Sequence, residues 1–249
     1  MTPALRTEHL TRRFGALEAL GDVSLAIASG ARHALIGPNG AGKTTLVNLL
    51  AGSLAPSAGE VYLAGERITP LAQYRRVKRG LVRTFQVSSL FGGLTVLESV
   101  VLAILEREGR AALWRRPVAR CTVEIDEAMA LLGELRLADD AGRRASALAY
   151  GRQRLLEIAL ALASRPRVLL LDEPAAGIPA AQSAEVFRAI AALPAAVTVL
   201  FIEHDMELVF RFAERITVLA GGRVLAEGAP EEIARDRAVR EVYLGTADA

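Results

Sequence analysis

The sequence has almost no cysteine, since Cys121 is the only one in 249 residues. An internal disulfide and a cysteine-rich zinc site are therefore both excluded. Cys121 itself is expected to be an ordinary small side chain. Lysine is nearly as rare, because Lys43 and Lys78 are the only two lysines among 30 basic residues. Arginine supplies almost all of the positive charge, so a position that keeps lysine is informative.

Long hydrophobic runs are also missing, although 52% of the residues are hydrophobic and the mean hydropathy is +0.30. The longest apolar runs, at residues 168–171 and 195–202, fall far short of the roughly 20 residues that a membrane-spanning helix requires. They suit buried parallel strands instead. Residues 1–14 are polar and charged and contain no apolar segment of a signal peptide. These features predict a cytosolic protein.

No block of basic residues dominates the chain, and the net charge is only +2. The pI of about 9.0 reflects the many arginines. A nucleic-acid partner is therefore not expected. A chain of this length and composition can bury a substantial core as one domain, with room for a subdomain.

One glycine-rich run fits the phosphate-binding pattern G-x-x-x-x-G-K-[ST] without a mismatch. It consists of Gly37, Pro38, Asn39, Gly40, Ala41, Gly42, Lys43 and Thr44. Glycines let backbone N–H groups surround phosphate oxygens, the lysine faces the β- and γ-phosphates, and the threonine hydroxyl ligates Mg²⁺. An apolar stretch precedes the run and a helical pattern beginning at Thr45 follows it, so the helix N-terminus points at the anion. The sequence thus predicts a nucleotide-binding P-loop.

Three apolar strands are each followed by polar residues that suit one shared site. The strands are expected at residues 32–36, 168–171 and 198–202. The first enters the P-loop, the second ends in Asp172 and Glu173, and the third ends in Glu203 and His204. Ligands of an open parallel sheet bind beyond the carboxyl ends of its strands. We therefore expect these three ends to meet at one phosphate site.

The polar residues after these strands are candidates for catalysis. Asp172 is expected to hold the Mg²⁺ shell, and Glu173 to polarise a water for in-line attack on the γ-phosphate. His204 suits a donor to the γ-phosphate, although a single histidine is more often a packed or surface residue. Gln86 is a candidate to sense Mg²⁺ or the attacking water, although taken alone it would be an ordinary loop residue.

Several helices and a hairpin are predicted around these strands. Thr95 and Glu98 form a capping box before a helix that runs to about Leu105. Amphipathic or apolar spacing predicts helices over 125–135 and 155–162. A glycine pair at 221–222 predicts a hairpin, and 229–232 opens a short helix. The arginine-rich stretch 107–120, which contains Trp114, is expected to be a solvated surface or a contact with lipid headgroups or a partner.

A second anion site is predicted at residues 148–154, directly before the helix at 155–162. A turn of small residues that opens a helix offers free backbone N–H groups and the positive end of the helix dipole. An ordinary glycine-bearing helix start is the alternative interpretation.

Taken in order, these motifs resemble the nucleotide-binding subunit of an ABC transporter over essentially the whole chain. The motif set is 37–45, Gln86, 148–153, 169–173 and His204. Further details resemble the branched-chain (hydrophobic) amino acid importer ATPases: 83–86, 90–91, 94–98, the Leu-Ala-Tyr-Gly form of the signature at 148–151, 172–177 and 202–206.

The resemblance implies an α/β fold of the P-loop NTPase class, with a RecA-like core, an antiparallel β-subdomain and a helical subdomain. Residues 1–249 would form a single ABC ATPase domain. The core and β-subdomain would occupy about 1–86 and 163–228, the helical subdomain about 87–162, and a helical tail about 229–249. ATP and Mg²⁺ are the implied cofactors, with Thr44, Gln86 and Asp172 at the metal.

Dimeric ATP binding is a further implication. Two subunits would pair head to tail, as a homodimer or with a related ATPase subunit. The signature residues Ala149, Tyr150 and Gly151 of one subunit would close on ATP in the P-loop of the other. Phe14 matches the aromatic residue that stacks on adenine, whereas its alternative interpretation is a core phenylalanine.

Membrane partners are implied as well. The region around residues 86–94 would receive coupling helices of transmembrane permease subunits, which would hold the chain peripherally at the cytoplasmic face of the inner membrane. The sequence departs from the family pattern at Ala149, where serine is usual, at Arg152, where glutamine is usual, and at Pro179, where an aspartate or asparagine is common. No catalytic group is lost by these changes.

Other functions fit the sequence less well. A soluble ABC ATPase that acts on DNA or ribosomes usually carries coiled-coil insertions, paired cassettes or zinc modules, and none is present in the sequence. A GTPase would need an N-K-x-D motif, and Lys78 lies in no such motif. Importer relatives for urea, amides or aromatic acids remain as alternatives for the solute.

Overall fold

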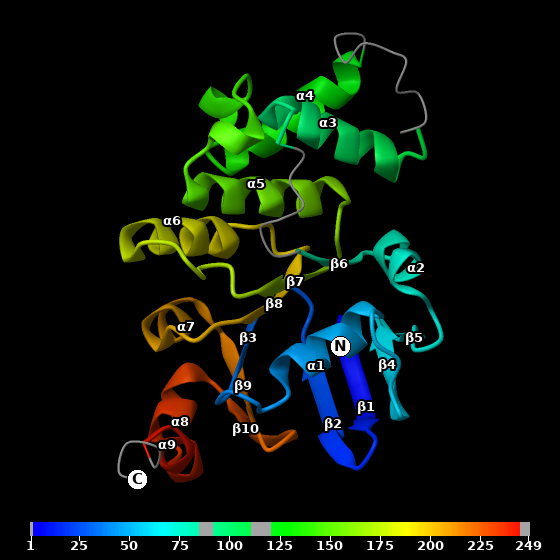
Figure 1. The fold of residues 1–249 in the computed structure, drawn as a ribbon, viewed down its shortest axis with the longest axis vertical. Coiled ribbons are helices and arrows are strands. Elements are labelled where there is room, and N and C mark those ends of the chain that lie inside the picture. The colour runs from blue at the N-terminus through cyan, green and yellow to red at the C-terminus, as the bar shows by residue number, and fades with distance from the viewer. Residues whose placement is uncertain (1, 85–91, 111–120, 245–249) are drawn as a thin grey trace.

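The computed structural model describes residues 2–84, 92–110 and 121–244. Two β-sheets and a group of helices make up this part of the chain (Figure 1). The smaller sheet has the strand order β2-β1-β4-β5, and all of its neighbours are antiparallel. Its strands are β1 (Leu5–Phe14), β2 (Leu17–Ile27), β4 (Ala58–Leu63) and β5 (Glu66–Arg67).

The larger sheet has the order β10-β9-β3-β8-β7-β6. Its neighbours are parallel except for the antiparallel hairpin of β9 and β10. The strands are β3 (Arg32–Ile36), β6 (Leu81–Arg83), β7 (Val168–Asp172), β8 (Thr198–Ile202), β9 (Arg215–Ala220) and β10 (Arg223–Gly228). The predicted strands at 32–36, 168–171 and 198–202 are thus confirmed, and they lie side by side.

Successive side chains of the central strands point to opposite faces of the large sheet and so divide the core into two parts. In β7, Val168 and Leu170 pack with the small sheet and with α1 (Lys43–Ala51), whereas Leu169 and Leu171 face the helices on the opposite side. The period of two in a strand explains this division. By the same alternation Asp172 follows Leu170 onto the face that α1 covers. The sheet therefore carries the acidic strand end to the helix that follows the P-loop.

Helices cover the large sheet and extend beyond it. Figure 1 shows α3, α4 and α5 in the upper part of the molecule, well separated from α1. The helices after α1 are α2 (Gln73–Lys78), α3 (Val96–Arg107), α4 (Thr122–Glu134), α5 (Tyr150–Ala163), α6 (Ala180–Ala191), α7 (Met206–Phe212), α8 (Pro230–Arg235) and α9 (Arg237–Leu244). Short 3₁₀ turns occupy Ala138–Asp140 and Ala145–Ala147.

Local sequence signals explain several helix ends. The Thr95 hydroxyl accepts a hydrogen bond from the Glu98 N–H, and the Glu98 carboxylate accepts one from the Thr95 N–H, as the capping box predicted. The glycine pair forms the turn between β9 and β10, and Pro230 begins α8 as expected. Two helix starts were predicted too late. The helix expected from 125 begins at Thr122. The helix expected from 155 begins at Tyr150, so the predicted turn is its first helical turn.

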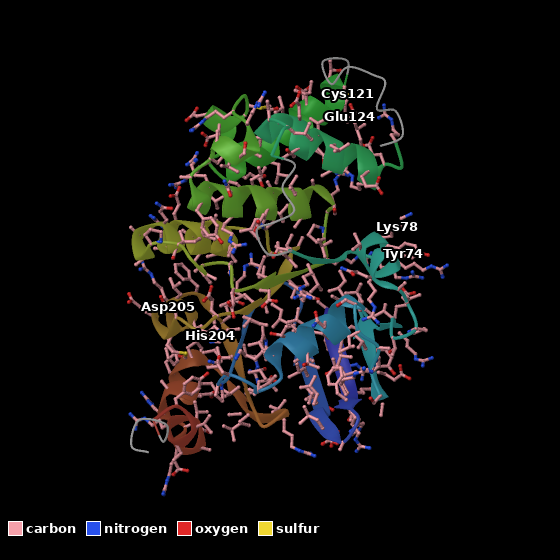
Figure 2. The ribbon with its side chains drawn as sticks, viewed as in Figure 1. Tyr74, Lys78, Cys121, Glu124, His204 and Asp205 are labelled. Atoms are coloured by element: carbon pink, nitrogen blue, oxygen red, sulfur yellow. The ribbon has the colours of Figure 1, made fainter. Side chains whose placement is uncertain are left out.

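The predicted α/β architecture, a mainly parallel sheet with a separate antiparallel sheet and a group of helices, is confirmed. The subdomain boundaries near 86–87, 162–163 and 228–229 stay predictions. Within the described residues, no helix combines the length and the hydropathy required to cross a bilayer. Cys121 is buried at the start of α4, and Figure 2 shows it far from His204.

Candidate nucleotide-binding site

The P-loop joins β3 to α1 with a backbone that only glycine adopts easily. Gly37 has φ 154°, and a Cβ there would lie 2.2 Å from the carbonyl oxygen of Leu219. Gly42 caps α1 with φ 99°. The Lys43 Nζ donates to the carbonyl oxygens of Gly37 at 2.7 Å and Pro38 at 3.0 Å. The loop is therefore a closed ring around a buried ammonium, at the positive end of a helix.

The hairpin turn supports this loop from the side. The N–H of Gly222 donates to the Ala41 carbonyl, and its own carbonyl accepts from the N–H of Gly21. Gly222 has φ 76°, and a Cβ there would lie 2.8 Å from the carbonyl oxygen of Ala19. The turn thus connects the P-loop to the small sheet. Sequence reasoning identified the hairpin but missed this role, because the contact spans distant parts of the chain.

Asp172 ends β7 and is held by an arginine that the sequence did not assign to the site. The Arg83 guanidinium donates to Asp172 Oδ2 at 2.7 Å and to Asn48 Oδ1, on α1, at 2.6 Å. The Arg83 and Asp172 side chains are 16% and 10% exposed. An ion pair shielded from water to this degree fixes the carboxylate more firmly than a surface pair.

Glu173 and His204 come together across neighbouring strand ends. The His204 Nε2 lies 2.9 Å from Glu173 Oε1. Glu173 has φ 49°, which is unusual for a residue with a side chain. Backbone strain of this kind is concentrated at functional sites. The two residues that were predicted to act on the attacking water and the γ-phosphate therefore contact each other directly.

Glu203, between strand β8 and His204, is a buried carboxylate that the sequence analysis left without a role. Its Oε1 accepts from the Ala175 N–H at 2.8 Å and its Oε2 from the His204 N–H at 3.1 Å. Burial raises the pKa of Glu203, and these backbone donors oppose that shift. The carboxylate holds the loop after Glu173 against the loop that carries His204. Its place after an apolar strand was the only signal in the sequence.

One pocket of about 440 Å³ joins the P-loop to Glu173 and His204, whereas Asp172, Arg83 and Glu203 do not line it. Its wall contains the P-loop, Glu173, His204 and the turn residues Gly221 and Gly222. Burial lowers the pKa of Lys43, and the carboxylates of Glu173 and Asp172 oppose the shift. The predicted convergence of three strand ends is therefore present. Gln86, which was predicted to act at the same place, lies outside the described residues.

Phe14 lies at the end of β1 and is 45% exposed, so its alternative interpretation as a core residue is wrong. The Arg12 guanidinium covers its ring at 4.5 Å. Leu17, which lines the pocket, is also exposed. An exposed ring at the end of a strand is available to stack on a base.

The start of α5 lies outside the P-loop pocket. None of Ala149, Tyr150 and Gly151 lines the pocket that the described residues form around the P-loop. Ala149, the N-cap, is exposed. Gly151 is buried, and a Cβ there would lie 2.7 Å from Gln182 Oε1 of the same chain. The free end of this helix therefore faces solvent at Ala149, while Gly151 packs within its own subunit.

The unusual Arg152 and Pro179 have structural partners. The Arg152 Nε donates to Asp140, and its terminal nitrogen donates to the Arg136 carbonyl at 2.6 Å. Pro179 is the N-cap of α6. Both residues thus support the helices around the start of α5.

The donor set fits Mg²⁺ bound with a nucleotide. This ion keeps several waters and uses one or two protein ligands together with phosphate oxygens. The Thr44 hydroxyl at the start of α1 and the Asp172 carboxylate on the same face of the sheet are of this type. Among the described residues there is no cluster of three or more His, Cys, Asp or Glu side chains for an all-protein cage.

Comparison with known families gives two matches. The ABC transporter model matches residues 20–176. The model for the branched-chain amino acid ATP-binding cassette transporter matches residues 223–249.

Curated relatives match over nearly the full length. The high-affinity branched-chain amino acid transport ATP-binding protein BraF of Pseudomonas aeruginosa is 41% identical, with 98% of this chain and 99% of the relative covered. LivG of Escherichia coli, which has the same descriptive name, is 39% identical with the same coverage.

Solved structures of ABC transporter cassettes also match this chain. The ADP conformation of MJ1267, an ATP-binding cassette of an ABC transporter, has a TM-score of 0.85 and 30% identity, with 98% of this chain and 100% of that chain covered. The dimeric structure of MJ0796, a bacterial ABC transporter cassette, has a TM-score of 0.75 and 26% identity, with coverage of 91% and 98%.

Proposed function

The chain belongs to the ABC transporter family, and from this premise we propose that it hydrolyses ATP to drive import of branched-chain or other hydrophobic amino acids. The activity class, ATP hydrolysis for transport, belongs to the family. The observation that carries the hydrolytic role is the meeting of the P-loop with Glu173 and His204 in one pocket. The proposal that the solute is a branched-chain amino acid is supported by the similarity to BraF and LivG and by the family match at 223–249.

In this proposal the P-loop and the polar residues at the strand ends have separate chemical tasks. The P-loop N–H groups and Lys43 bind the β- and γ-phosphates. Glu173 accepts a proton from a water whose oxygen attacks the γ-phosphorus, while the bond to the β-phosphate oxygen breaks. His204 orients Glu173 and donates to the γ-phosphate. Mg²⁺, held by Thr44 and Asp172 and by Gln86, would neutralise charge on the phosphates.

The same proposal assigns the exposed start of α5 to a second subunit. Ala149, Tyr150 and Gly151 would cap the triphosphate held by the other copy, or by a related ATPase subunit, and Phe14 would stack on adenine. The distance of α5 from α1 in one chain supports this arrangement (Figure 1). The free N–H groups at a helix N-terminus can bind a phosphate, and here that phosphate would belong to ATP on the other subunit.

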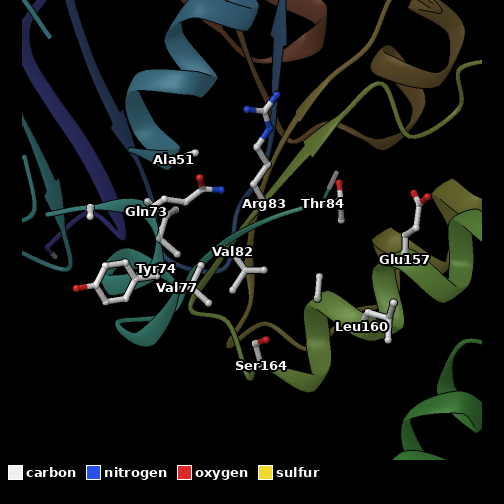
Figure 3. Close-up of a pocket in the computed structure, with 13 residues that line it drawn as sticks. Ala51, Gln73, Tyr74, Val77, Val82, Arg83, Thr84, Glu157, Leu160 and Ser164 are labelled. Atoms are coloured by element: carbon white, nitrogen blue, oxygen red, sulfur yellow. The ribbon is translucent and has the colours of Figure 1, made fainter. Parts of the chain in front are cut away.

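Membrane subunits complete the proposed transporter. A groove between α2 and α5, whose wall includes Arg83 and Thr84 (Figure 3), is the proposed docking place for a coupling helix of a permease. The chain would then lie peripherally at the cytoplasmic face of the inner membrane. ATP-driven closure of two subunits would move the two grooves together and change the access of the permease.

A substitution at Glu173 tests the function. In cells that depend on this chain, Glu173→Gln should abolish uptake of labelled leucine and lower ATP turnover by about 10²-fold or more, because the general base is removed. ATP binding should persist and the dimer should be stabilised. Glu231→Gln, at an exposed carboxylate of α8, is the control.

Unimpaired hydrolysis in Glu173→Gln would remove this residue from its role. If the chain supported uptake of urea, amides or aromatic acids in place of leucine, the proposed ATPase activity would stand and the proposed solute would be wrong.

A further inference from the structure

The ring of Phe14, which the proposed function assigns to adenine, is in contact with an arginine of its own strand. The Arg12 guanidinium lies 4.5 Å from the centre of the ring. Residues two apart in a strand project from the same side, so β1 brings these two side chains together. Phe14 is nevertheless 45% exposed. The arginine therefore covers one part of the ring and leaves the rest open to a flat ligand.

Arg12 is anchored on the side of β1 that lies away from the P-loop pocket. Its Nη1 donates to the carbonyl oxygen of Ala55 at 2.9 Å, in the loop between α1 and β4. Strands β4 and β2 flank β1 on opposite sides. The residue opposite Phe14 in β2 is Leu17, which lines the pocket. The guanidinium thus approaches the ring from the β4 side, whereas the pocket opens on the β2 side.

The ring takes the place of an acidic partner for this arginine. Arg12 forms no ion pair with the residues that the structure describes, and its buried Nε has no hydrogen-bond acceptor among them. The electron-rich face of an aromatic ring attracts a cation and is a weak substitute for an acceptor. The contact therefore restrains the Arg12 and Phe14 side chains together.

A second set of contacts fixes the hairpin that carries Phe14. The Glu18 carboxylate accepts from Arg13 of β1 at 2.9 Å and from Arg223 of β10 at 2.9 Å. Arg223 directly follows the glycine turn that supports the P-loop. The end of β1 is thus tied to the phosphate-binding side of the pocket. The ring has a defined place relative to the P-loop.

We propose that Arg12 is a positioning residue for the nucleobase, because it holds the Phe14 ring from behind and leaves the pocket side free for adenine. The inference rests on the proposed function and adds a residue that acts on the base through Phe14. A ring that is already ordered loses less side-chain freedom when the base stacks on it, so binding is tighter. Phosphates are bound separately by the P-loop. The contribution of Arg12 should therefore appear only for ligands that carry a base.

Two ligands that differ in the adenosine group test this. Binding of Mg²⁺–ADP to the full chain is measured by isothermal titration calorimetry, and binding of Mg²⁺–pyrophosphate is measured by its competition with ADP. Arg12→Met, which keeps an unbranched side chain without the charge, should weaken ADP about fivefold and leave pyrophosphate unchanged. Arg12→Lys keeps the charge but lacks the planar guanidinium, so it should give a smaller loss.

The same strand offers a matched control. The Arg6 guanidinium lies 4.4 Å from the centre of the Tyr62 ring, near the other end of β1. Arg6→Met removes a contact of the same kind, and neither affinity should change. Melting temperatures check that each variant is folded.

A double substitution tests whether Arg12 acts through the ring. Phe14→Ala alone should weaken ADP. In a Phe14→Ala chain, Arg12→Met should have no further effect, because the residue that transmits its effect is gone. An equal loss in both backgrounds would show that Arg12 contacts the nucleotide itself, and its role as a positioning residue would be wrong.

The outcomes separate this inference from the proposed function. If Phe14→Ala weakened ADP and Arg12→Met did not, the inference would be overturned and the stacking of adenine on Phe14 would stand. Weaker pyrophosphate binding in Arg12→Met would also overturn the inference, because the effect would then lie at the phosphates. Unchanged ADP binding in Phe14→Ala would overturn both the inference and the assignment of Phe14.

Discussion

Individual carboxylates in the site depend on neighbours that hold them in place. Asp172 is bound by Arg83, and Glu173 is bound by His204. Glu203 accepts from two backbone N–H groups and thereby fixes the loops on either side of the site. Each carboxylate is thus held in one defined orientation by groups of the chain itself. Electrostatic preorganisation of this kind costs nothing during the reaction.

The sequence predicted the chemistry of the site but not these supporting contacts. The P-loop, Asp172, Glu173 and His204 follow from short motifs next to apolar strands. Arg83 is separated from Asp172 by 89 positions, and Gly222 meets Ala41 of the P-loop from a hairpin that lies even farther along the chain. Such contacts depend on strand order, which no local pattern contains. They could be assigned only when the sheet was known.

A buried histidine in β3 makes the stability of the chain depend on pH. His33 is 1% exposed, and its Nε2 lies 2.7 Å from the Thr217 hydroxyl. Burial lowers the pKa of His33 to about 4 from an ordinary value of 6.5. The unfolded chain therefore binds more protons between these values, and stability is lost as the pH falls from 6.5 to 4.

Replacing His33 by a side chain that does not ionise should change how the unfolding free energy depends on pH. His33→Gln keeps a hydrogen-bonding group beside Thr217 but does not ionise. Between pH 6.5 and 4 the wild type should lose roughly 3 kcal/mol more unfolding free energy than His33→Gln. Urea titrations at several pH values measure both curves. Parallel curves for the two proteins would show that His33 is not the group responsible.

Helix α5 belongs to the core, lines the groove beside α2 and carries the proposed capping residues at its start. Its inner face is fully buried, whereas its N-cap is exposed and makes no side-chain capping hydrogen bond. Helix starts with serine, threonine, aspartate or asparagine are easier to predict, because those side chains bond to the first free N–H groups. Ala149 gives no such signal, and Gly151 suggests a turn. This explains why the start at Tyr150 was missed while the start of α3 was predicted correctly.

Restoring a capping side chain should stabilise α5. Ala149→Ser should raise the unfolding free energy by about 1 kcal/mol, since its hydroxyl can accept from a first-turn N–H. Ala130→Ser, at an exposed interior position of α4, should instead be slightly destabilising. Urea titration compares the three proteins. Equal effects of the two substitutions would contradict capping at residue 149.

Under the proposed function, the molecule as a whole contains both halves of an ATP site but keeps them apart. The P-loop pocket lies at the carboxyl end of the parallel strands, and the exposed end of α5 does not reach it in the same chain. The groove between α2 and α5 is lined by the end of α1 and by the second half of α5. Closure of one copy on another would complete two pockets and move two grooves together.

A substitution at Gly151 would be a poor test of this closure, because a side chain there would meet Gln182 of its own subunit. Exposed Ala149 and exposed Asn39 of the P-loop avoid that problem. The single native cysteine, buried Cys121, can be replaced by serine, which favours a helix N-cap. All engineered thiols are then defined.

Formation of a disulfide between differently tagged copies is the decisive measurement. One copy carries Asn39→Cys and the other Ala149→Cys, both with Cys121→Ser and Glu173→Gln. With ATP and Mg²⁺, oxidation should join the two different copies, and much less product should form without nucleotide. Absence of the mixed disulfide in protein shown to bind ATP would contradict closure of one copy on the nucleotide of another.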